Sequence, residues 1–138
     1  MQPDLQKAFT TLGDAAFVSL TTFRKNGERI SSPLWIARDG DALIIITPQE
    51  SAKVKRLRNN QHVEMRPCDW QGKVADGSEP VPGTAELVTD DASAARLTRV
   101  IQKKYGLEYH VFMLIERIAA RRQKPRVLFR ITSLAANT

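Results

Sequence analysis

Apolar and polar residues alternate with a period of two over much of the chain, which is typical of β-strands. This alternation, together with runs of β-branched, aromatic or apolar residues, predicts strands at residues 16–24, 29–38, 42–47, 62–70, 82–88 and 126–132. Asn26 and Gly27 lie between the first two strands and favour a tight hairpin turn, because both tolerate positive φ angles. Pro33 cannot donate to a ladder, so the second strand is expected at an edge or at a bulge.

Four other segments repeat their apolar residues every three or four positions, as amphipathic helices do. These segments are residues 3–14, 51–60, 90–106 and 108–122. Asp90 and Asp91 suit the start of the third helix, and Gly106 suits its end. The fourth helix is expected to carry one apolar face formed by Val111, Leu114, Ile115 and Ile118.

This order of elements predicts a mainly β fold: a six-stranded antiparallel β-barrel with α-helices on its outside. We expect it to form one domain over residues 1–138. A barrel of this size fills its interior with side chains, so a large ligand would lie on the outer wall or between subunits. The strand at 42–47 is apolar on both faces, so a helix, a second subunit or a cofactor ring must cover its outer face.

The chain is basic, with 21 Lys and Arg against 15 Asp and Glu and a net charge of +6. This balance favours anionic partners without choosing among them. Aromatic residues make up only 7% of the chain. That is sparse for the stacking platforms of single-strand binders, so we expect no nucleic-acid partner.

No apolar run is long enough to span a membrane, and residues 1–4 do not resemble a signal peptide. Cys68 is the only cysteine, which excludes an intrachain disulfide. Together these features predict a cytoplasmic protein with no membrane partner.

Familiar catalytic and metal-binding motifs are absent from the sequence. There is no G-x-G-x-x-G or Walker loop, and Cys68, His62 and His110 do not have the spacing of metal ligands, so no metal site is predicted. We expect His62 to be partly exposed at a strand start. Cys68 is expected to act as a small apolar residue rather than as a nucleophile.

The turn that follows the strand at 42–47 is the best candidate for a binding site. Thr47 lies at the strand end, Ser51 at the predicted N-cap of a helix, and Lys53 in the first turn of that helix. Hydroxyl groups, free backbone N–H groups and a cation together suit a phosphate. Alternatively, Ser51 only caps the helix and Lys53 points into solvent.

The two tryptophans have open roles. Trp35 could lie against a planar cofactor, or it could pack beneath a helix or across a dimer interface. Trp70 lies near a strand end and beside Lys73. It could close the same site from a partner chain, or anchor an interface.

An ordered series of segments runs through the chain: Ser32–Ile36, Ile44–Thr47, Ser51–Leu57, Val63–Asp69 and Gly83–Leu87. This series resembles the pyridoxamine 5′-phosphate oxidase-like split-barrel proteins, over roughly residues 5–132. Within that superfamily the chain is most similar to the coenzyme F420-dependent branch, the flavin/deazaflavin oxidoreductases. The resemblance implies a split barrel of the FMN-binding type. It also implies a homodimer with a flat three-ring cofactor, F420 or FMN, at each of two interface sites.

The resemblance also assigns roles to residues. It places the cofactor phosphate at Thr47, Ser51 and Lys53, and an anionic tail near Arg58. The ring edge falls along the strand Ser32, Pro33, Leu34 and Trp35. The stretch that a partner subunit contributes matches residues 70–73, including Trp70 and Lys73.

One departure from the family pattern bears on the cofactor. Pyridoxamine phosphate oxidases carry an Arg-x-x-x-Lys element for the FMN phosphate, and the corresponding strand from Ser31 to Arg38 lacks such a pair. This argues against that oxidase activity and places F420 ahead of FMN. The many cations also suit the polyglutamate tail of F420.

The expected function is hydride transfer between F420 and a small organic electrophile. An FMN-dependent oxidoreductase and a non-catalytic flavin- or deazaflavin-binding protein remain as alternatives. The sequence identifies no catalytic side chain. Tyr105, Tyr109 or a bound water could supply a proton. Lys53 is expected to be exposed when no ligand is bound.

Overall fold

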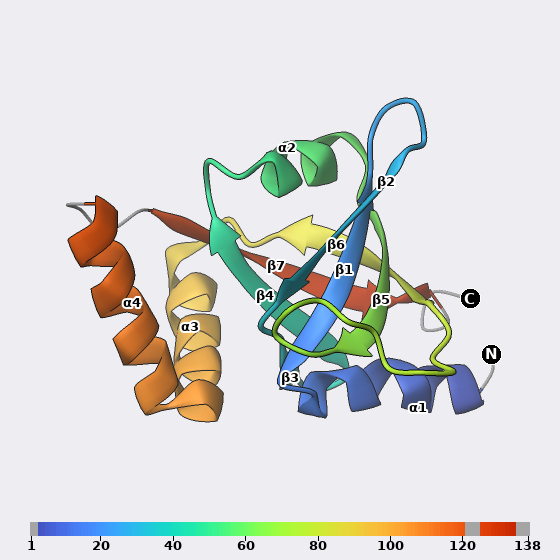
Figure 1. Cartoon of the computed structure of the whole chain (residues 1–138), viewed down its shortest axis with the longest axis horizontal. Helices are drawn as coiled ribbons and strands as arrows, with labels where there is room; N and C mark the ends of the chain where they lie inside the picture. The colour runs from blue at the N-terminus through green and yellow to red at the C-terminus, as the bar shows by residue number, and fades with distance from the viewer. Residues whose placement is uncertain (1–2, 121–124, 135–138) are drawn as a thin grey trace.

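The computed structural model describes residues 3–120 and 125–134, which form one antiparallel sheet surrounded by helices (Figure 1). The described strands follow the order β2-β1-β5-β6-β7-β4-β3 across the sheet. Their bounds are β1 (Phe17–Phe23), β2 (Arg29–Leu34), β3 (Ala37–Asp39), β4 (Ala42–Pro48), β5 (His62–Cys68), β6 (Val81–Leu87) and β7 (Arg126–Ser133). The predicted mainly β fold with flanking helices is therefore confirmed.

The four predicted helices are present in the described residues, and the first ends in a short 3-10 turn. They are α1 (Pro3–Thr11) with η1 (Leu12–Asp14), α2 (Ala52–Asn59), α3 (Asp91–Tyr105) and α4 (Leu107–Ala120). Residues 121 and 122, predicted at the end of the fourth helix, lie outside the described residues. Asp90 caps α3 by accepting a hydrogen bond from the Ser93 N–H, and Gly106 ends it with a φ of 56°. Figure 1 shows α3 and α4 side by side on one flank of the sheet, with α1 and α2 at its other sides.

Among the described residues, no helix is both long and apolar enough to cross a membrane.

The predicted number of strands is wrong. The segment 29–38 forms two strands, β2 and β3, which lie at opposite edges of the sheet. Trp35 and Ile36 join them and belong to neither strand. The strand stops because both backbone polar groups of Ile36 bond to the hydroxyl of Tyr105 instead of to a neighbouring strand.

The core has two parts, one on each side of β4. Leu43 and Ile45 point into the barrel, whereas Ile44 packs outward against Leu97 and Ile101 of α3. The prediction that this strand is apolar on both faces is thus confirmed. Of the covers that the sequence left open, α3 lies over the outer face at Ile44.

The turn between β1 and β2 has the predicted tight geometry. Gly27 has a φ of 89°, which favours glycine. The Arg24 N–H donates to the Glu28 carbonyl over 3.0 Å. This hairpin fixes the register in which Leu34 lies opposite Val18, and so it places the end of β2 beside the cleft described below.

Candidate functional site

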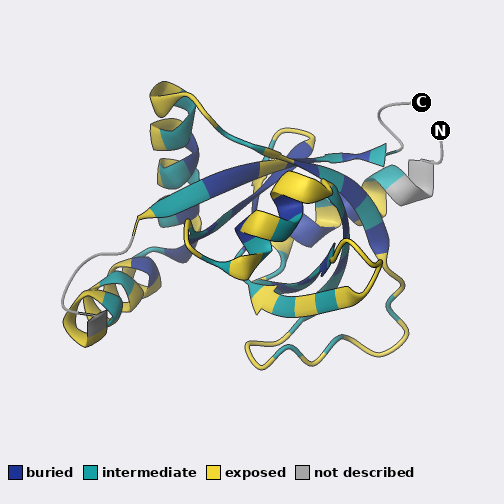
Figure 2. Ribbon diagram, turned by 90° about the horizontal axis from the view of Figure 1, so that it is seen from above, coloured by how far each residue is buried: buried dark blue, intermediate teal, exposed yellow. Residues whose placement is uncertain are grey.

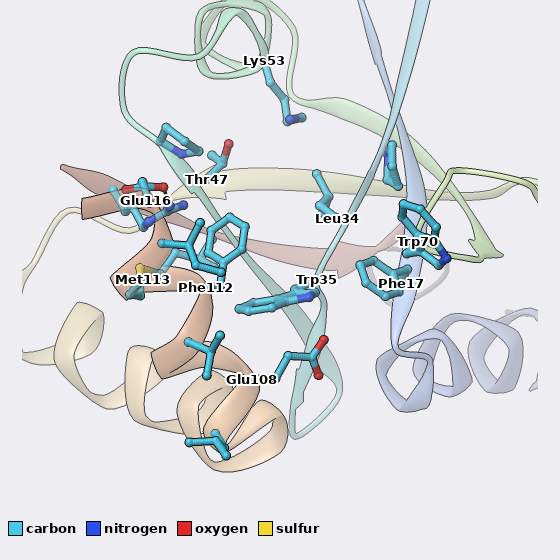
Figure 3. Close-up of a pocket in the computed structure, with 17 residues that line it drawn as sticks. Phe17, Leu34, Trp35, Thr47, Lys53, Trp70, Glu108, Phe112, Met113 and Glu116 are labelled. Carbon is cyan, nitrogen blue, oxygen red and sulfur yellow. Dashed lines mark hydrogen bonds and ion pairs between the residues drawn. The ribbon is translucent and has the colours of Figure 1, made fainter. Parts of the chain in front are cut away.

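A cleft of about 710 Å³ lies between the outer wall of the barrel and α4 (Figure 3). Its walls come from the ends of β2 and β4, the first turn of α2, the turn after β5, and one side of α4. Most of the lining side chains are apolar or aromatic. The lining residues are Phe17, Pro33, Leu34, Trp35, Ile46, Thr47, Pro48, Lys53, Trp70, Leu107, Glu108, Val111, Phe112, Met113, Ile115, Glu116 and Arg126.

Two members of the predicted phosphate-binding turn reach this cleft. Thr47 and Lys53 line it, and Figure 3 shows the Lys53 side chain pointing from α2 toward it. Ser51 is not among the lining residues. Its hydroxyl accepts from the Val54 N–H over 3.4 Å, which confirms the predicted N-cap, and it lies 3.3 Å from the Thr47 hydroxyl.

Lys53 is half-buried, so the expectation that it is exposed without a ligand is wrong. Burial lowers the pKa of its ammonium group, and the nearby Arg56 lowers it further. No carboxylate in the described part of the chain forms an ion pair with Lys53. The ammonium group therefore lies in a largely apolar cleft without an ion-pair partner among the described residues.

Trp35 forms the middle of the cleft wall. Its ring stacks on that of Tyr105, with centroids 4.4 Å apart and planes at 15°. The Phe112 ring lies 5.4 Å away and is tilted by 56°. Packing beneath the α3–α4 pair is thus what the structure shows, and Trp35 lines the cleft as well. Figure 3 shows it between Phe112 on one side and Phe17 with Trp70 on the other.

Trp70 lines the same cleft and belongs to a tightly bonded turn of this chain. The Asp69 carboxylate accepts from the backbone N–H groups of Gln71 and Lys73, over 3.0 and 2.9 Å. The Trp70 side chain nevertheless remains 70% exposed. A large aromatic ring is therefore held in a fixed turn at the edge of the cleft.

The structure brings together only part of the predicted cofactor site. The predicted residues that line the cleft are Pro33, Leu34, Trp35, Thr47, Lys53 and Trp70. Those that do not line it are Ser32, Ser51, Arg58 and Lys73. Arg58 is exposed on α2, and five residues of helix rotate it by roughly 140° from Lys53. Lys73 is exposed in the turn after β5, and Ser32 lies opposite Leu20 in the ladder between β1 and β2.

An ion pair that no sequence pattern predicted lies at the α4 end of the cleft. Arg126 of β7 bonds to Glu116 of α4, and these side chains are only 12% and 14% exposed. The Arg126 guanidinium also lies 5.5 Å from the centre of the Phe112 ring. Arg126 shares a strand face with Leu128, Arg130 and Thr132, which is mostly polar in sequence, so no local pattern marked Arg126 as a buried cation.

The two tyrosines named as proton donors are buried, and each is only 9% exposed. The Tyr105 hydroxyl is bonded to backbone groups of Ala16 and Ile36, and burial raises its pKa to about 12. Tyr105 is thus part of the scaffold behind the cleft. The thiol of Cys68 lies outside the cleft, and burial raises its pKa, as expected of an unreactive cysteine.

A family model described as pyridoxamine 5′-phosphate oxidase matches residues 5–138. The chain belongs to this family. No curated protein matches it in sequence.

Solved structures share the fold at low sequence identity. A FAD-binding protein from Mesorhizobium loti aligns with a TM-score of 0.66 and 18% identity, over 96% of this chain and 89% of its own. An F420 reductase aligns with a TM-score of 0.58 and 18% identity, over 91% and 92%. The heme storage protein HutZ from Vibrio cholerae aligns with a TM-score of 0.59 and 16% identity, over 96% and 89%. These likenesses establish the split-barrel fold.

Proposed function

We propose that the protein is an oxidoreductase that binds the deazaflavin coenzyme F420 in the cleft and transfers hydride between it and a small organic electrophile. One observation carries the proposal: Lys53 is a half-buried cation for which the described residues offer no carboxylate partner. Burying a charge without a partner is costly, so an anionic group on a ligand would stabilise it. The Thr47 hydroxyl and the first turn of α2 add hydrogen-bond donors beside it.

The rest of the cleft fits the flat part of such a coenzyme. A volume of about 710 Å³ lies within the usual range for small-molecule sites. Trp35, Phe112 and Trp70 offer aromatic surfaces along it. Membership of the pyridoxamine 5′-phosphate oxidase family supports a flavin-like ligand, as does the fold shared with a FAD-binding protein and an F420 reductase.

The bound coenzyme would supply the hydride chemistry, and the protein would supply binding, orientation and exclusion of water. Lys53 and Thr47 would hold the anionic end. Leu34, Ile46 and Phe112 would keep water from the ring. We assign no acid to the reaction, because the Tyr105 hydroxyl is already bonded to the backbone.

FMN is the alternative cofactor, and binding without turnover is the alternative function. F420 stands first because the strand from Ser31 to Arg38 lacks an Arg-x-x-x-Lys pair and because the net charge of +6 suits a polyglutamate tail. Both alternatives would use the same cleft, so only binding and turnover measurements separate them.

We also propose that the protein works as a homodimer in which a second copy covers α4. The apolar side chains on this helix are exposed, and they adjoin the cleft. Leu107, Ile115 and Ile118 are 77%, 60% and 70% exposed. A continuous apolar stripe of this kind is typical of a surface that another protein covers.

Titration of the purified protein with F420 and with FMN tests the proposal, with ligand fluorescence as the signal. We expect F420 to bind more tightly than FMN, with a Kd well below 1 mM. A Kd of 1 mM corresponds to a binding free energy of roughly −4 kcal/mol. If neither F420 nor FMN binds at millimolar concentration, the proposal is refuted. Tighter binding of FMN than of F420 would favour the alternative cofactor.

Turnover is then measured with reduced F420 and a panel of enones and quinones. Oxidation of the coenzyme that depends on both protein and acceptor is the expected result. Tight F420 binding without reduction of any acceptor would identify a binding protein rather than an enzyme.

A further inference from the structure

The break between β2 and β3 lies where the barrel would otherwise close. These strands are the two edges of the sheet, and the chain passes from one to the other through Trp35 and Ile36. A strand that continued through this point would satisfy its backbone groups in a ladder. At this break, side chains at the end of α3 form the hydrogen bonds to the backbone instead.

Tyr105 satisfies the backbone at the break. The Ile36 N–H donates to the Tyr105 hydroxyl oxygen over 2.9 Å. The same hydroxyl lies 2.7 Å from the Ala16 carbonyl and 2.9 Å from the Ile36 carbonyl. A phenol has one hydrogen to donate, so it serves one of the two carbonyls at a time while it accepts from the N–H.

The preceding residue, Lys104, binds the remaining carbonyl groups. Its ammonium group donates to the carbonyls of Gly13, Ala15 and Ile36, over 2.8, 2.5 and 2.5 Å. These carbonyls come from two segments that are distant in sequence. A carbonyl oxygen has two lone pairs, so the Ile36 carbonyl can accept from both Lys104 and Tyr105, and it stays bonded through Lys104 when the Tyr105 hydrogen is donated to Ala16. Two consecutive side chains of α3 thus replace the missing ladder.

Tyr105 also holds the side chain next to the break. Its ring stacks on Trp35 at 4.4 Å and 15°, while its hydroxyl holds the backbone of Ile36. We infer that Tyr105 is a positioning residue for the ligand site: it fixes the Trp35 ring and backbone before a ligand enters, and Lys104 secures the same backbone. This inference rests on the proposed function only in treating Trp35 as part of the ligand-binding wall.

The test compares Tyr105→Phe, which keeps the ring and removes the hydroxyl, with Tyr109→Phe as the matched control. The centroid of the Tyr109 ring lies 6.2 Å from that of Trp35, and the two ring planes are tilted by 35°. We expect Tyr105→Phe to weaken F420 binding about 2- to 10-fold, the effect of one neutral hydrogen bond. Tyr109→Phe should leave the affinity unchanged.

A second measurement follows Trp35 directly and needs no ligand. The chain has two tryptophans, so a Trp70→Phe background leaves Trp35 as the only one. In that background, Tyr105→Phe should lower the fluorescence anisotropy of Trp35 and shift its emission to longer wavelength. Ile101→Val, a core change on α3, serves as a control for loss of stability alone.

A lower Tm with unchanged Trp35 emission and unchanged affinity would show that Tyr105 only stabilises the fold, and would overturn the inference. If wild-type protein binds neither F420 nor FMN, the proposed function fails, yet the emission comparison still decides whether Tyr105 positions Trp35. If Tyr105→Phe does not fold, Lys104→Met removes a bond to the same Ile36 carbonyl and must change Trp35 emission in the same direction.

Discussion

At the scale of single residues, ligand binding should depend most on Lys53. We expect Lys53→Ala to weaken F420 binding by about 1–3 kcal/mol, because the variant loses a charge-assisted hydrogen bond in a partly desolvated site. Lys55→Ala is the matched control, since Lys55 is exposed on the same helix and lies outside the cleft. Fluorescence titration of F420 measures both. Equal affinity in the two variants would place the anionic group elsewhere.

Residues that are close in sequence were the predictable part of the site. The order of strand end, cap and first helical turn was enough to group Thr47 with Lys53, because local geometry connects them. Arg126 could not be grouped with them in this way. It reaches the cleft because β7 pairs with β4 in a register that sets Arg126 opposite Pro48, and that register follows from no local pattern.

At the scale of elements, an ion pair joins the edge strand β3 to α3. Arg96 donates two hydrogen bonds to the Asp39 carboxylate, over 3.0 and 3.2 Å. This contact lowers the pKa of Asp39 below its ordinary value, so the folded state favours the ionised form. The resulting stability is present above the ordinary pKa and is lost as the pH falls through the lowered one.

We therefore expect Asp39→Asn to be less stable than the wild type near neutral pH. The difference in the free energy of unfolding between the two proteins should shrink progressively below about pH 5, as the wild-type carboxylate is protonated. Urea unfolding at a series of pH values measures this difference. Asp41→Asn, an exposed change in the same turn, should show no such pattern. A stability difference between wild type and Asp39→Asn that does not change as the pH is lowered would contradict a stabilising role for the Asp39–Arg96 contact.

Periodicity was a good guide to elements and a poor guide to their interruptions. Among the described residues, five of the six predicted strands and the four predicted helices appear close to their expected bounds, because each keeps a regular pattern of apolar positions along its length. The segment from Arg29 to Arg38 keeps its alternation, yet it forms two strands. The group that divides it, the Tyr105 hydroxyl, comes from 69 residues further along the chain.

At the scale of the whole molecule, α4 is the element that the rest of the chain covers least. Figure 2 shows it projecting from the barrel with much of its surface exposed. Its apolar stripe was predicted correctly from the spacing of Val111, Leu114, Ile115 and Ile118, but all four are exposed. A single sequence shows that such a face needs a cover and does not say whether the cover lies in the same chain.

If a second copy of the chain covers α4, the apolar face of this helix is the dimer interface, and mutation of that face should disrupt the dimer. Replacing Leu114 and Ile118 together by Glu should convert a dimer into a monomer, because a charge in an apolar interface is costly to desolvate. The fold should survive, since these side chains are 56% and 70% exposed in a single chain. Analytical ultracentrifugation measures the oligomeric state, and far-UV circular dichroism checks the fold.

His110→Glu is the matched control on the same helix, because His110 is exposed and polar and should tolerate the same new charge. If the second copy also borders the cleft, the double variant should lose F420 affinity together with the dimer, because one wall of the cleft belongs to α4. Loss of the dimer with full retention of affinity would mean that one chain completes the site alone. A wild-type protein that sediments as a monomer at micromolar concentration would remove the second copy as the cover of α4.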